Sequence, residues 1–297
     1  MHKKIIQKLN RLFSFDDQVF LACSGGADSV FLLEMLHLAG FKNVTVLHFN
    51  HNLRGDLSDG DEDFVAELSS HCGFGFVSEK WQKPSKSEED CRKARFDFFD
   101  RNRSNKPLLL AHHADDDVET CFFNFLRGTG LRGLSGISEI DLRRQFYRPL
   151  LDVSKAEILE YMESNQLMYR DDASNFESEY ARNYLRNEIF PLIEKKFPYF
   201  KGSVKRQKSI YQDVEDFLAI EAGCFIDGGN EFSRSDFARL HKALQRAVVR
   251  GIFDVNLDAK NVDDLIDFIG NGVSNKKMII KNRQILIFGD NFFFSKL

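Results

Sequence analysis

The residues best suited to chemistry form a glycine-rich turn after the short apolar run at 19–22. Residues 24–29 read Ser-Gly-Gly-Ala-Asp-Ser, so hydroxyls and a carboxylate gather where a strand would end and a helix begin. Two glycines allow a sharp turn close to a ligand, and the free amides at a helix start attract phosphate. The stretch therefore predicts a phosphate-binding loop in preference to an ordinary strand-to-helix turn. It matches neither the Walker pattern nor the dinucleotide fingerprint.

Two more segments place polar side chains after apolar runs, where strands of a sheet would end. His48 lies at the end of the run at 44–49, and His112 follows the run at 108–111. Asp116 and Glu119 are three residues apart at a predicted helix start, so both carboxylates can face one pocket. The ordinary alternatives are structural histidines and acids that stabilise a helix start. Zinc is not favoured, because no third ligand of defined spacing accompanies them.

Basic residues and a second glycine-rich stretch supply further candidates. Arg92 and Arg95 lie on one face of a predicted helix, for which a solvated, ion-paired face is the ordinary alternative. Gly128 belongs to the stretch at 127–136, which can bring backbone amides near phosphates or act as a mobile loop. A basic amphipathic helix and a basic cluster further along the chain could contact RNA. These candidates are Arg182, Arg186, Lys205 and Arg206.

Composition bounds the class of protein. The chain has 297 residues, of which 43% are hydrophobic and 29% charged, as in an ordinary soluble protein long enough for two domains. A net charge of −4 argues against indiscriminate nucleic-acid binding and leaves room for a local basic face. Five cysteines without a Cys-x-x-Cys pair indicate reduced thiols. With no long apolar run and no signal-peptide pattern, we expect a cytoplasmic protein that does not enter membranes.

The order of the apolar runs predicts the fold. Short runs predict strands at 19–22, 44–49, 74–79 and 108–111, separated by helical patterns. This alternation predicts a doubly wound, mostly parallel, Rossmann-like α/β sheet. Beyond residue 200, helical patterns at 203–224, 235–253 and 258–269 precede three short apolar runs. We therefore expect a catalytic domain at 1–200 with a helical extension, and a smaller, mainly helical domain at 201–297 with a terminal β-meander.

The pattern Ser-Gly-Gly-x-Asp-Ser resembles the pyrophosphate-binding loop of the N-type ATP pyrophosphatases, the PP-loop superfamily. Together with the Glu-x-x-x-Arg pattern ending at Arg92 and the motif at 112–119, most of 19–191 is similar to the tRNA(Ile)-lysidine synthetase family. The resemblance implies a sheet of the adenine nucleotide alpha hydrolase-like kind. It also implies adenylation by ATP, with Mg²⁺, of the wobble cytidine of an isoleucine tRNA with a CAU anticodon. The ε-amine of free L-lysine then displaces AMP. The sequence does not decide between a monomer and a homodimer.

The resemblance also implies roles for residues of this chain. Asp28 is expected to bind the magnesium ion. The expected catalytic residues are Asp28, Arg92 and His112. His112 is also expected at the lysine end, with Asp116 and Glu119. The expected ATP-binding residues are Ser24, Gly25, Gly26, Ala27, Asp28, Ser29, His48 and Gly128. The expected tRNA contacts are Arg182, Arg186, Lys205 and Arg206. Asp117 departs from the family, which commonly carries Gln there, and leaves the charge at that point open.

Three alternatives stay open. A tRNA thiolase or an amide-forming ATP pyrophosphatase would use the same loop with another acceptor, and a regulatory module would bind a nucleotide without chemistry. The missing Cys-x-x-Cys pair counts against the thiolase, and the missing glutaminase-like segment counts against the amide-forming enzyme. Arg92, His112, Asp116 and Glu119 exceed what binding alone needs, which favours an enzyme.

Overall fold

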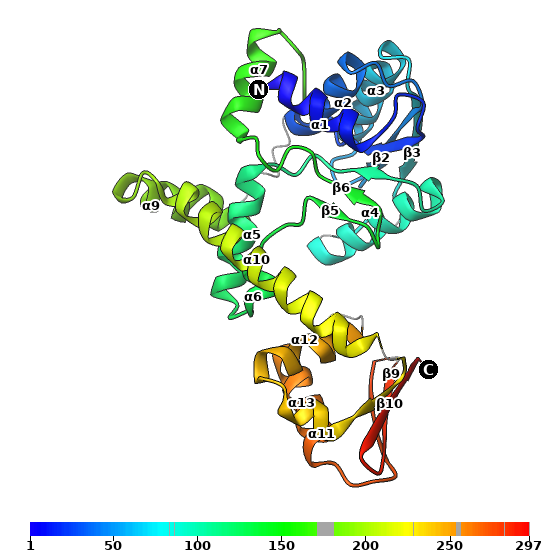
Figure 1. Cartoon of the computed structure of the whole chain (residues 1–297). Coiled ribbons are helices and arrows are strands. Elements are labelled where there is room, and N and C mark those ends of the chain that lie inside the picture. Colours follow the sequence, from blue (N-terminus) through cyan, green and yellow to red (C-terminus); the bar gives the residue numbers. More distant parts are fainter. Residues whose placement is uncertain are drawn as a thin grey trace. The chain divides into compact units, whose positions relative to one another are not determined.

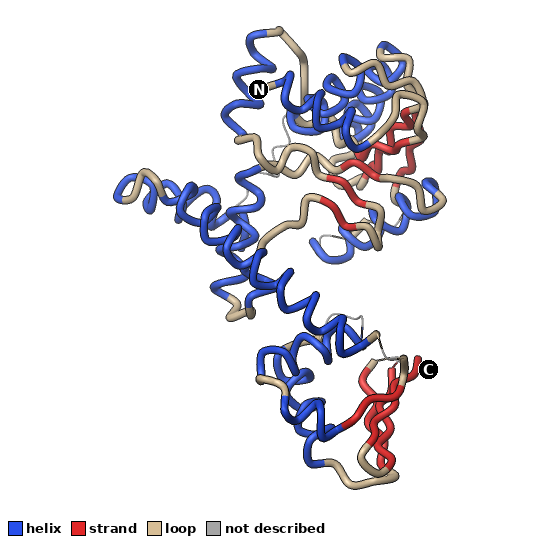
Figure 2. The backbone as a smooth tube through the Cα atoms, in the orientation of Figure 1, coloured by secondary structure: helices blue, strands red, loops and turns tan. Residues whose placement is uncertain are grey.

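The computed structural model describes residues 1–82, 84–85, 87–170, 181–227, 229–253, 257–281 and 283–296 (Figures 1 and 2). The chain forms two compact units. The first comprises Met1–Phe123 and Ile137–Lys201, and the second Asn124–Gly136 and Gly202–Leu297. The predicted domains 1–200 and 201–297 differ from these units chiefly at 124–136, which group with the second unit.

A six-stranded sheet forms the centre of the first unit, in the order β3-β2-β1-β4-β6-β5. Its strands are β1 (Val19–Ala22), β2 (Val44–Asn50), β3 (Gly75–Lys80), β4 (Leu108–Leu109), β5 (Ile140–Asp141) and β6 (Phe146–Tyr147). All pairs are parallel except β5 with β6. The strand order reverses between β1 and β4, and doubly wound sheets bind ligands beyond the carboxyl ends of strands at such a reversal. The predicted fold class is confirmed.

Helices cover both faces of this sheet (Figure 1). Those that begin in the first unit are α1 (His2–Leu12), α2 (Ala27–Leu38), α3 (Asp56–His71), α4 (Glu88–Arg103), α5 (Ala114–Leu126), α7 (Lys155–Ser164), α8 (Ala181–Tyr184), a π-helical stretch (Leu185–Ile189), α9 (Phe190–Lys196) and α10 (Phe200–Ile226). Successive strand residues point to opposite faces. Leu21 accordingly packs with α2 residues such as Phe31, whereas Phe20 packs with Phe98 of α4.

The second unit combines helices with an antiparallel sheet in the order β7-β10-β9-β8. Its strands are β7 (Glu231–Ser233), β8 (Lys276–Ile280), β9 (Arg283–Phe288) and β10 (Asn291–Lys296). Its helices, besides most of α10, are α6 (Leu131–Leu134), α11 (Arg234–Arg239), α12 (Lys242–Phe253) and α13 (Ala259–Asn271). Phe237, Phe253 and Phe292 are buried in its core. The expected terminal β-meander is present as β8, β9 and β10.

Several element bounds differ from the prediction. The strand expected at 108–111 pairs only over Leu108–Leu109, and β5, β6 and β7 were not predicted because two or three paired residues show no periodicity. The helix expected at 235–253 breaks after α11, where Leu240 is extended and Nδ1 of His241 accepts the backbone N–H of Ala243 at 3.2 Å. Within the described residues, none of the helices has both the length and the apolar character needed to cross a membrane.

Candidate functional site

The glycine loop joins β1 to α2 and is closed by its own side chains. Gly25 has φ +92°, and a Cβ there would lie 3.3 Å from a methyl group of Val65. The Ser29 hydroxyl donates to the Gly26 carbonyl at 2.9 Å and accepts the Ser24 N–H at 3.3 Å. The loop is therefore shaped before any ligand binds, with the start of α2 beside it. Helix starts leave backbone N–H groups without intrahelical partners, which suits an anion.

His48 supports this loop from behind. Its side chain is buried, and Nδ1 lies 3.0 Å from the carbonyl oxygen of Cys23. Burial lowers the pKa of His48, outweighing this hydrogen bond and the nearby carboxylates of Glu62 and Asp61. The neutral ring can thus donate its Nδ1–H to the loop backbone. Direct contact between His48 and ATP stays a prediction. The contact observed in the structure is with the loop backbone, which His48 helps to hold in position.

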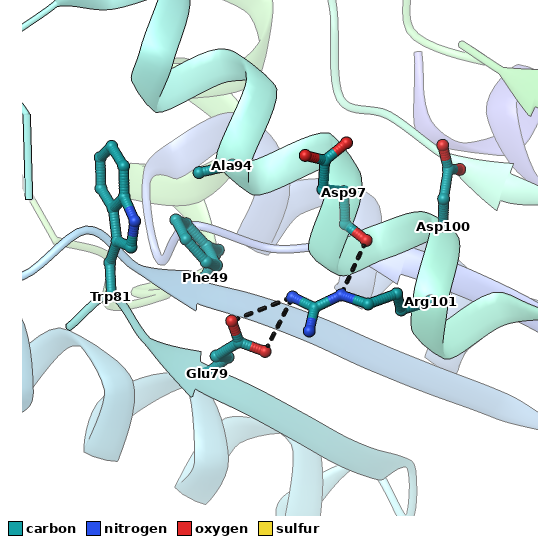
Figure 3. Close-up of a pocket in the computed structure, with 7 residues that line it drawn as sticks. All are labelled: Phe49, Glu79, Trp81, Ala94, Asp97, Asp100 and Arg101. Atoms are coloured by element: carbon teal, nitrogen blue, oxygen red, sulfur yellow. Dashed lines mark hydrogen bonds and ion pairs between the residues drawn. The ribbon is translucent and has the colours of Figure 1, made fainter. Parts of the chain in front are cut away.

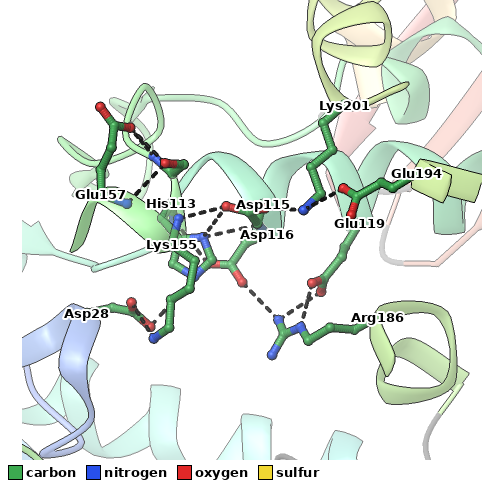
Figure 4. Close-up of polar contacts among 11 residues, drawn as sticks. Asp28, His113, Asp115, Asp116, Glu119, Lys155, Glu157, Arg186, Glu194 and Lys201 are labelled. Carbon is green, nitrogen blue, oxygen red and sulfur yellow. Dashed lines mark hydrogen bonds and ion pairs between the residues drawn. The ribbon is translucent and has the colours of Figure 1, made fainter. Parts of the chain in front are cut away.

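Asp28, in the first turn of α2, pairs with a residue that sequence reasoning missed. Its Oδ1 lies 2.7 Å from Nζ of Lys155, the first residue of α7 (Figure 4). Ser154 and Glu157 form a capping box that fixes the start of α7, and the Lys155 N–H donates to Asp115 at 2.8 Å. The Ser-x-x-Glu pattern was the available sequence signal, since it places a lysine at a helix start.

His113, rather than His112, joins the carboxylates of the site. It is buried after β4, with Nε2 3.6 Å from Oδ2 of Asp28 and 3.5 Å from Oδ2 of Asp116 (Figure 4). Its backbone N–H also donates to Asp116 at 3.0 Å. The prediction placed His112 with Asp116 and Glu119, but the contact to Asp116 comes from His113. The role of His112 at the lysine end stays a prediction. The two histidines are adjacent in sequence, so no spacing distinguished them.

Asp116 and Glu119 converge on one point, as their spacing suggested, and that point holds the guanidinium of Arg186 (Figure 4). Nε lies 2.5 Å from Oε1 of Glu119, and one terminal nitrogen lies 2.9 Å from Oε2 and 3.1 Å from Oδ1 of Asp116. Burial raises the pKa of Glu119 even though Arg186 opposes that shift. The predicted tRNA contact of Arg186 stays a prediction, and in this structure its side chain is used within the first unit.

Asp115 carries a second bridge on the same helix. Lys201 Nζ lies 2.8 Å from Asp115 and 2.8 Å from Glu194 (Figure 4). Burial alone would raise the pKa of Asp115, but the Lys155 N–H and the Lys201 ammonium lower it. Asp115 thus stays ionised and ties the starts of α5 and α7 together. Asp115 was not selected from sequence, and Lys201 was grouped only with the basic cluster at 201–208 that could contact RNA.

His112 faces surroundings of the opposite charge. Burial lowers its pKa to about 3, and Arg148, Arg95 and Arg92 add to that shift. Arg92 and Arg95 lie over Phe96 with Cζ 5.2 and 5.8 Å from the ring centroid. Arg148 was not selected from sequence.

Arg148 approaches the same place from the end of β6. Its Cζ lies 5.8 Å from the centroid of Phe146, and the Phe96 and Phe146 rings are 5.4 Å apart. Nδ1 of His112 and Nε of Arg148 are both buried without a hydrogen-bond partner among the described residues. The structure thus gathers a neutral imidazole and arginines from two elements at the end of the sheet.

The remaining predicted residues lie elsewhere. Asp117 is buried and accepts a hydrogen bond from the Ile137 N–H at 2.7 Å, so its carboxylate fixes the backbone at Ile137. Arg182 lies over Phe123, with Cζ 5.4 Å from the ring centroid. Gly128, at φ +69°, belongs to the second unit, as do Lys205 and Arg206 of α10. Their roles at ATP and tRNA stay predictions.

A separate hollow lies between α4 and the strands β2 and β3 (Figure 3). It is lined by Phe49, Glu79, Trp81, Ala94, Asp97, Asp100 and Arg101. Arg101 contacts both oxygens of Glu79 at 3.0 and 3.1 Å and donates to the Asp97 carbonyl at 3.2 Å. None of the predicted site residues lines this hollow. The Arg101 guanidinium is already bound to Glu79 and to the Asp97 carbonyl, which line the hollow with it.

The donor groups near the loop suit Mg²⁺ carried by a nucleotide. Mg²⁺ prefers oxygen ligands and is commonly held by one or two carboxylates, with phosphates and water completing the set. Asp28 supplies one carboxylate beside the loop, and Asp116 a second across His113. Among the described residues, no group of three or more His, Cys, Asp or Glu is arranged to hold a metal by itself. The phosphates would therefore complete such a site.

A mostly parallel sheet with a preformed loop after its first strand suits a phosphate-bearing ligand. The model of the PP-loop domain family matches residues 1–193, which places the chain in an ATP-using class. A tRNA(Ile)-lysidine synthase from Chlorobaculum tepidum is 36% identical over 245 residues, 76% of this chain and 72% of that protein. One from Clostridioides difficile is 31% identical, covering 96% of this chain and 68% of that protein. The chain belongs to the tRNA(Ile)-lysidine synthase family.

This membership confirms the expected family and agrees with the expected enzyme class, a ligase. The chain spans 52% of the relative from Bacteroides thetaiotaomicron, which is 34% identical, so some members are much longer. A U34-tRNA thiolase from Methanococcus maripaludis has a similar structure, with a TM-score of 0.56 and 16% identity over 71% of this chain and 78% of that one. That likeness shows the fold alone.

Proposed function

We propose that this chain ligates free L-lysine to C2 of the wobble cytidine of an isoleucine tRNA with a CAU anticodon. In the first step the C2 oxygen attacks the α-phosphorus of ATP, the bond to the β-phosphate breaks, and pyrophosphate leaves. In the second step the lysine ε-amine attacks C2, the bond from C2 to the AMP oxygen breaks, and the amine loses a proton. Family membership supports the reaction. The observation that carries it is the bridge from Asp28 through His113 to Asp116.

The loop side of that bridge suits the phosphates. Ser24, Gly25 and Gly26 with Ser29 would surround the pyrophosphate, because the loop is already shaped and lies at a helix start. Asp28 would hold Mg²⁺, which when bound offsets the negative charge of the phosphates. Lys155, 2.7 Å from Asp28, can keep that carboxylate in place or turn to a phosphate oxygen.

The other side suits the two organic substrates. Asp116 and Glu119 offer paired carboxylates to the ammonium of lysine, and His113 fixes Asp116. The arginines around His112, including Arg92, suit the charge that develops at the α-phosphate and the cytidine oxygen. In the second unit, Lys205 and Arg206 are proposed to contact tRNA phosphates, which bind lysine and arginine through charge.

The proposal is tested by transfer of radiolabelled lysine to total tRNA in the presence of ATP. Asp28→Asn removes the charge that would hold Mg²⁺ while keeping the shape of the side chain. We expect it to abolish lysine transfer and pyrophosphate release, with an unchanged circular dichroism spectrum. The matched control is Asp117→Asn, because Asp117 is an acid of the same unit whose carboxylate binds the Ile137 backbone N–H. This variant should keep both activities. A folded Asp28→Asn protein with normal turnover would remove the assignment.

A further inference from the structure

Arg186 occupies the place proposed for the cationic end of the substrate. One guanidinium contacts both oxygens of Glu119 and one oxygen of Asp116, at 2.5, 2.9 and 3.1 Å (Figure 4). This two-pronged contact is the strongest geometry available between arginine and a carboxylate. The acid pair therefore has a cation already bound, and that cation belongs to the chain itself.

The acid pair is largely shielded from solvent. The Glu119 side chain is only 8% exposed, and that of Asp116 is 23% exposed. A substrate ammonium bound to Glu119 beside Arg186 would lie within van der Waals reach of another positive charge. Like charges at such a distance repel strongly where water is scarce. The two cations are thus expected to exclude one another.

Arg186 is placed so that it can leave. Its side chain is 40% exposed, so part of it contacts solvent. It lies in the π-helical stretch Leu185–Ile189, and such stretches are frequent at functional sites because they interrupt regular helix geometry. Arg182, one turn earlier, instead lies over the ring of Phe123. The two arginines of this segment therefore offer a matched comparison.

We propose that Arg186 is an internal competitor of the amino-acid substrate: the substrate cation binds Asp116 and Glu119 only by displacing the Arg186 guanidinium. This inference rests on the proposed function for the identity of that substrate as lysine. It makes Arg186 a specificity-determining residue. An amino-acid substrate with a neutral side chain cannot displace the guanidinium, because displacement would leave the buried carboxylate of Glu119 without a partner, which is strongly unfavourable.

The test measures binding of L-lysine to the full-length protein without tRNA, by the rise in melting temperature over a lysine titration. It is done at about pH 8, so that Glu119 is ionised. Arg186→Gln should bind lysine at least about tenfold more tightly than the wild type, because no internal cation competes. L-norleucine, which keeps the α-amine of lysine but lacks its ε-amine, should stabilise neither protein. Arg182→Gln should bind lysine as the wild type does.

Two further arms separate charge from shape and from the proposed function. Arg186→Lys keeps a cation and should show no gain in lysine affinity. Ethylguanidinium, which mimics the end of arginine, should raise the melting temperature of Arg186→Gln and not that of the wild type. Equal or weaker lysine binding by folded Arg186→Gln, with no response to ethylguanidinium, would overturn the inference. Failure of the proposed function would instead appear as absent lysine transfer by the wild type, while the ethylguanidinium response persisted.

Discussion

His112 and His113 are neighbours in sequence, yet they lie in surroundings of opposite charge. His113 is within 3.6 Å of the carboxylates of Asp28 and Asp116, whereas His112 has the guanidinium groups of Arg148, Arg95 and Arg92 as its charged neighbours. Both follow Leu109, the last residue of β4, in a short segment that is neither helix nor strand. Two neighbouring residues of this segment therefore divide the site into an acidic side and a basic side.

The two sides also differ in how their charges are balanced. On the acidic side each carboxylate is paired, with Lys155, Arg186 and Lys201 supplying the cations. On the basic side His112 adds no charge, since its pKa lies at about 3. Its Nδ1 is buried without a hydrogen-bond partner in the part of the chain that the structure describes, so we assign the proton to Nε2. His112 can then donate a hydrogen bond but is a poor general base.

Between Arg92 on the basic side and Glu119 on the acidic side, the larger effect is expected at Arg92. Arg92→Ala should lower the turnover of lysine transfer by about 10²–10³-fold, because a charge that stabilises the adenylation transition state is lost. The apparent affinity for lysine should not change. Steady-state assays with lysine and tRNA varied in turn would measure both. Arg101→Ala, on the same helix and paired with Glu79, is the control and should keep normal turnover. A loss confined to lysine affinity would contradict the division into two sides.

A smaller effect is expected on the acidic side. Glu119→Gln should weaken the use of lysine by about tenfold to a hundredfold, since a charge-assisted contact is worth about 1.5–3 kcal/mol. ATP affinity should change far less. As the pH falls, lysine use should begin to decline at a higher pH than it would with an ordinary glutamate. The reason is that the pKa of Glu119 is raised and only its ionised form binds a cation.

Lysine dependence measured beside ATP affinity checks this prediction. Glu194→Gln, which removes a partner of Lys201 alone, is the matched control. If lysine affinity stayed within about twofold while ATP affinity collapsed, Asp116 and Glu119 would belong to the magnesium site instead.

The sequence was informative where local chemistry sets local structure. The glycine loop, the parallel sheet and the convergence of Asp116 with Glu119 all follow from spacing and periodicity over a few residues. It was silent where residues meet across the fold. Lys155 reaches Asp28 over 127 positions and Arg186 reaches Glu119 over 67, so no pattern within a segment could reveal these pairs. The choice between His112 and His113 depended on where β4 ends, which is the least predictable feature of a short strand.

The remaining expected effect concerns stability instead of activity, and it tests whether His112 is neutral. Its folded pKa of about 3 lies below its ordinary 6.5, so between these values the unfolded chain binds a proton that the folded chain does not. The stability that neutral His112 contributes is therefore complete above 6.5 and is lost as the pH falls toward about 3. Over that window it should add a slope of about 1.4 kcal/mol per pH unit to the free energy of unfolding.

Urea unfolding of the wild type and His112→Gln from neutral to mildly acidic pH would measure this slope. The variant places an amide near the position of Nε2 and cannot take up the proton, so its stability should fall less steeply with acid. His37→Gln, at an exposed position on α2, is the control and should keep the wild-type slope. In the same window the ring resonances of His112 should not shift in NMR spectra. Equal slopes together with a ring that titrates near neutral pH would show a charged His112, and the basic side would then carry one more cation than we infer.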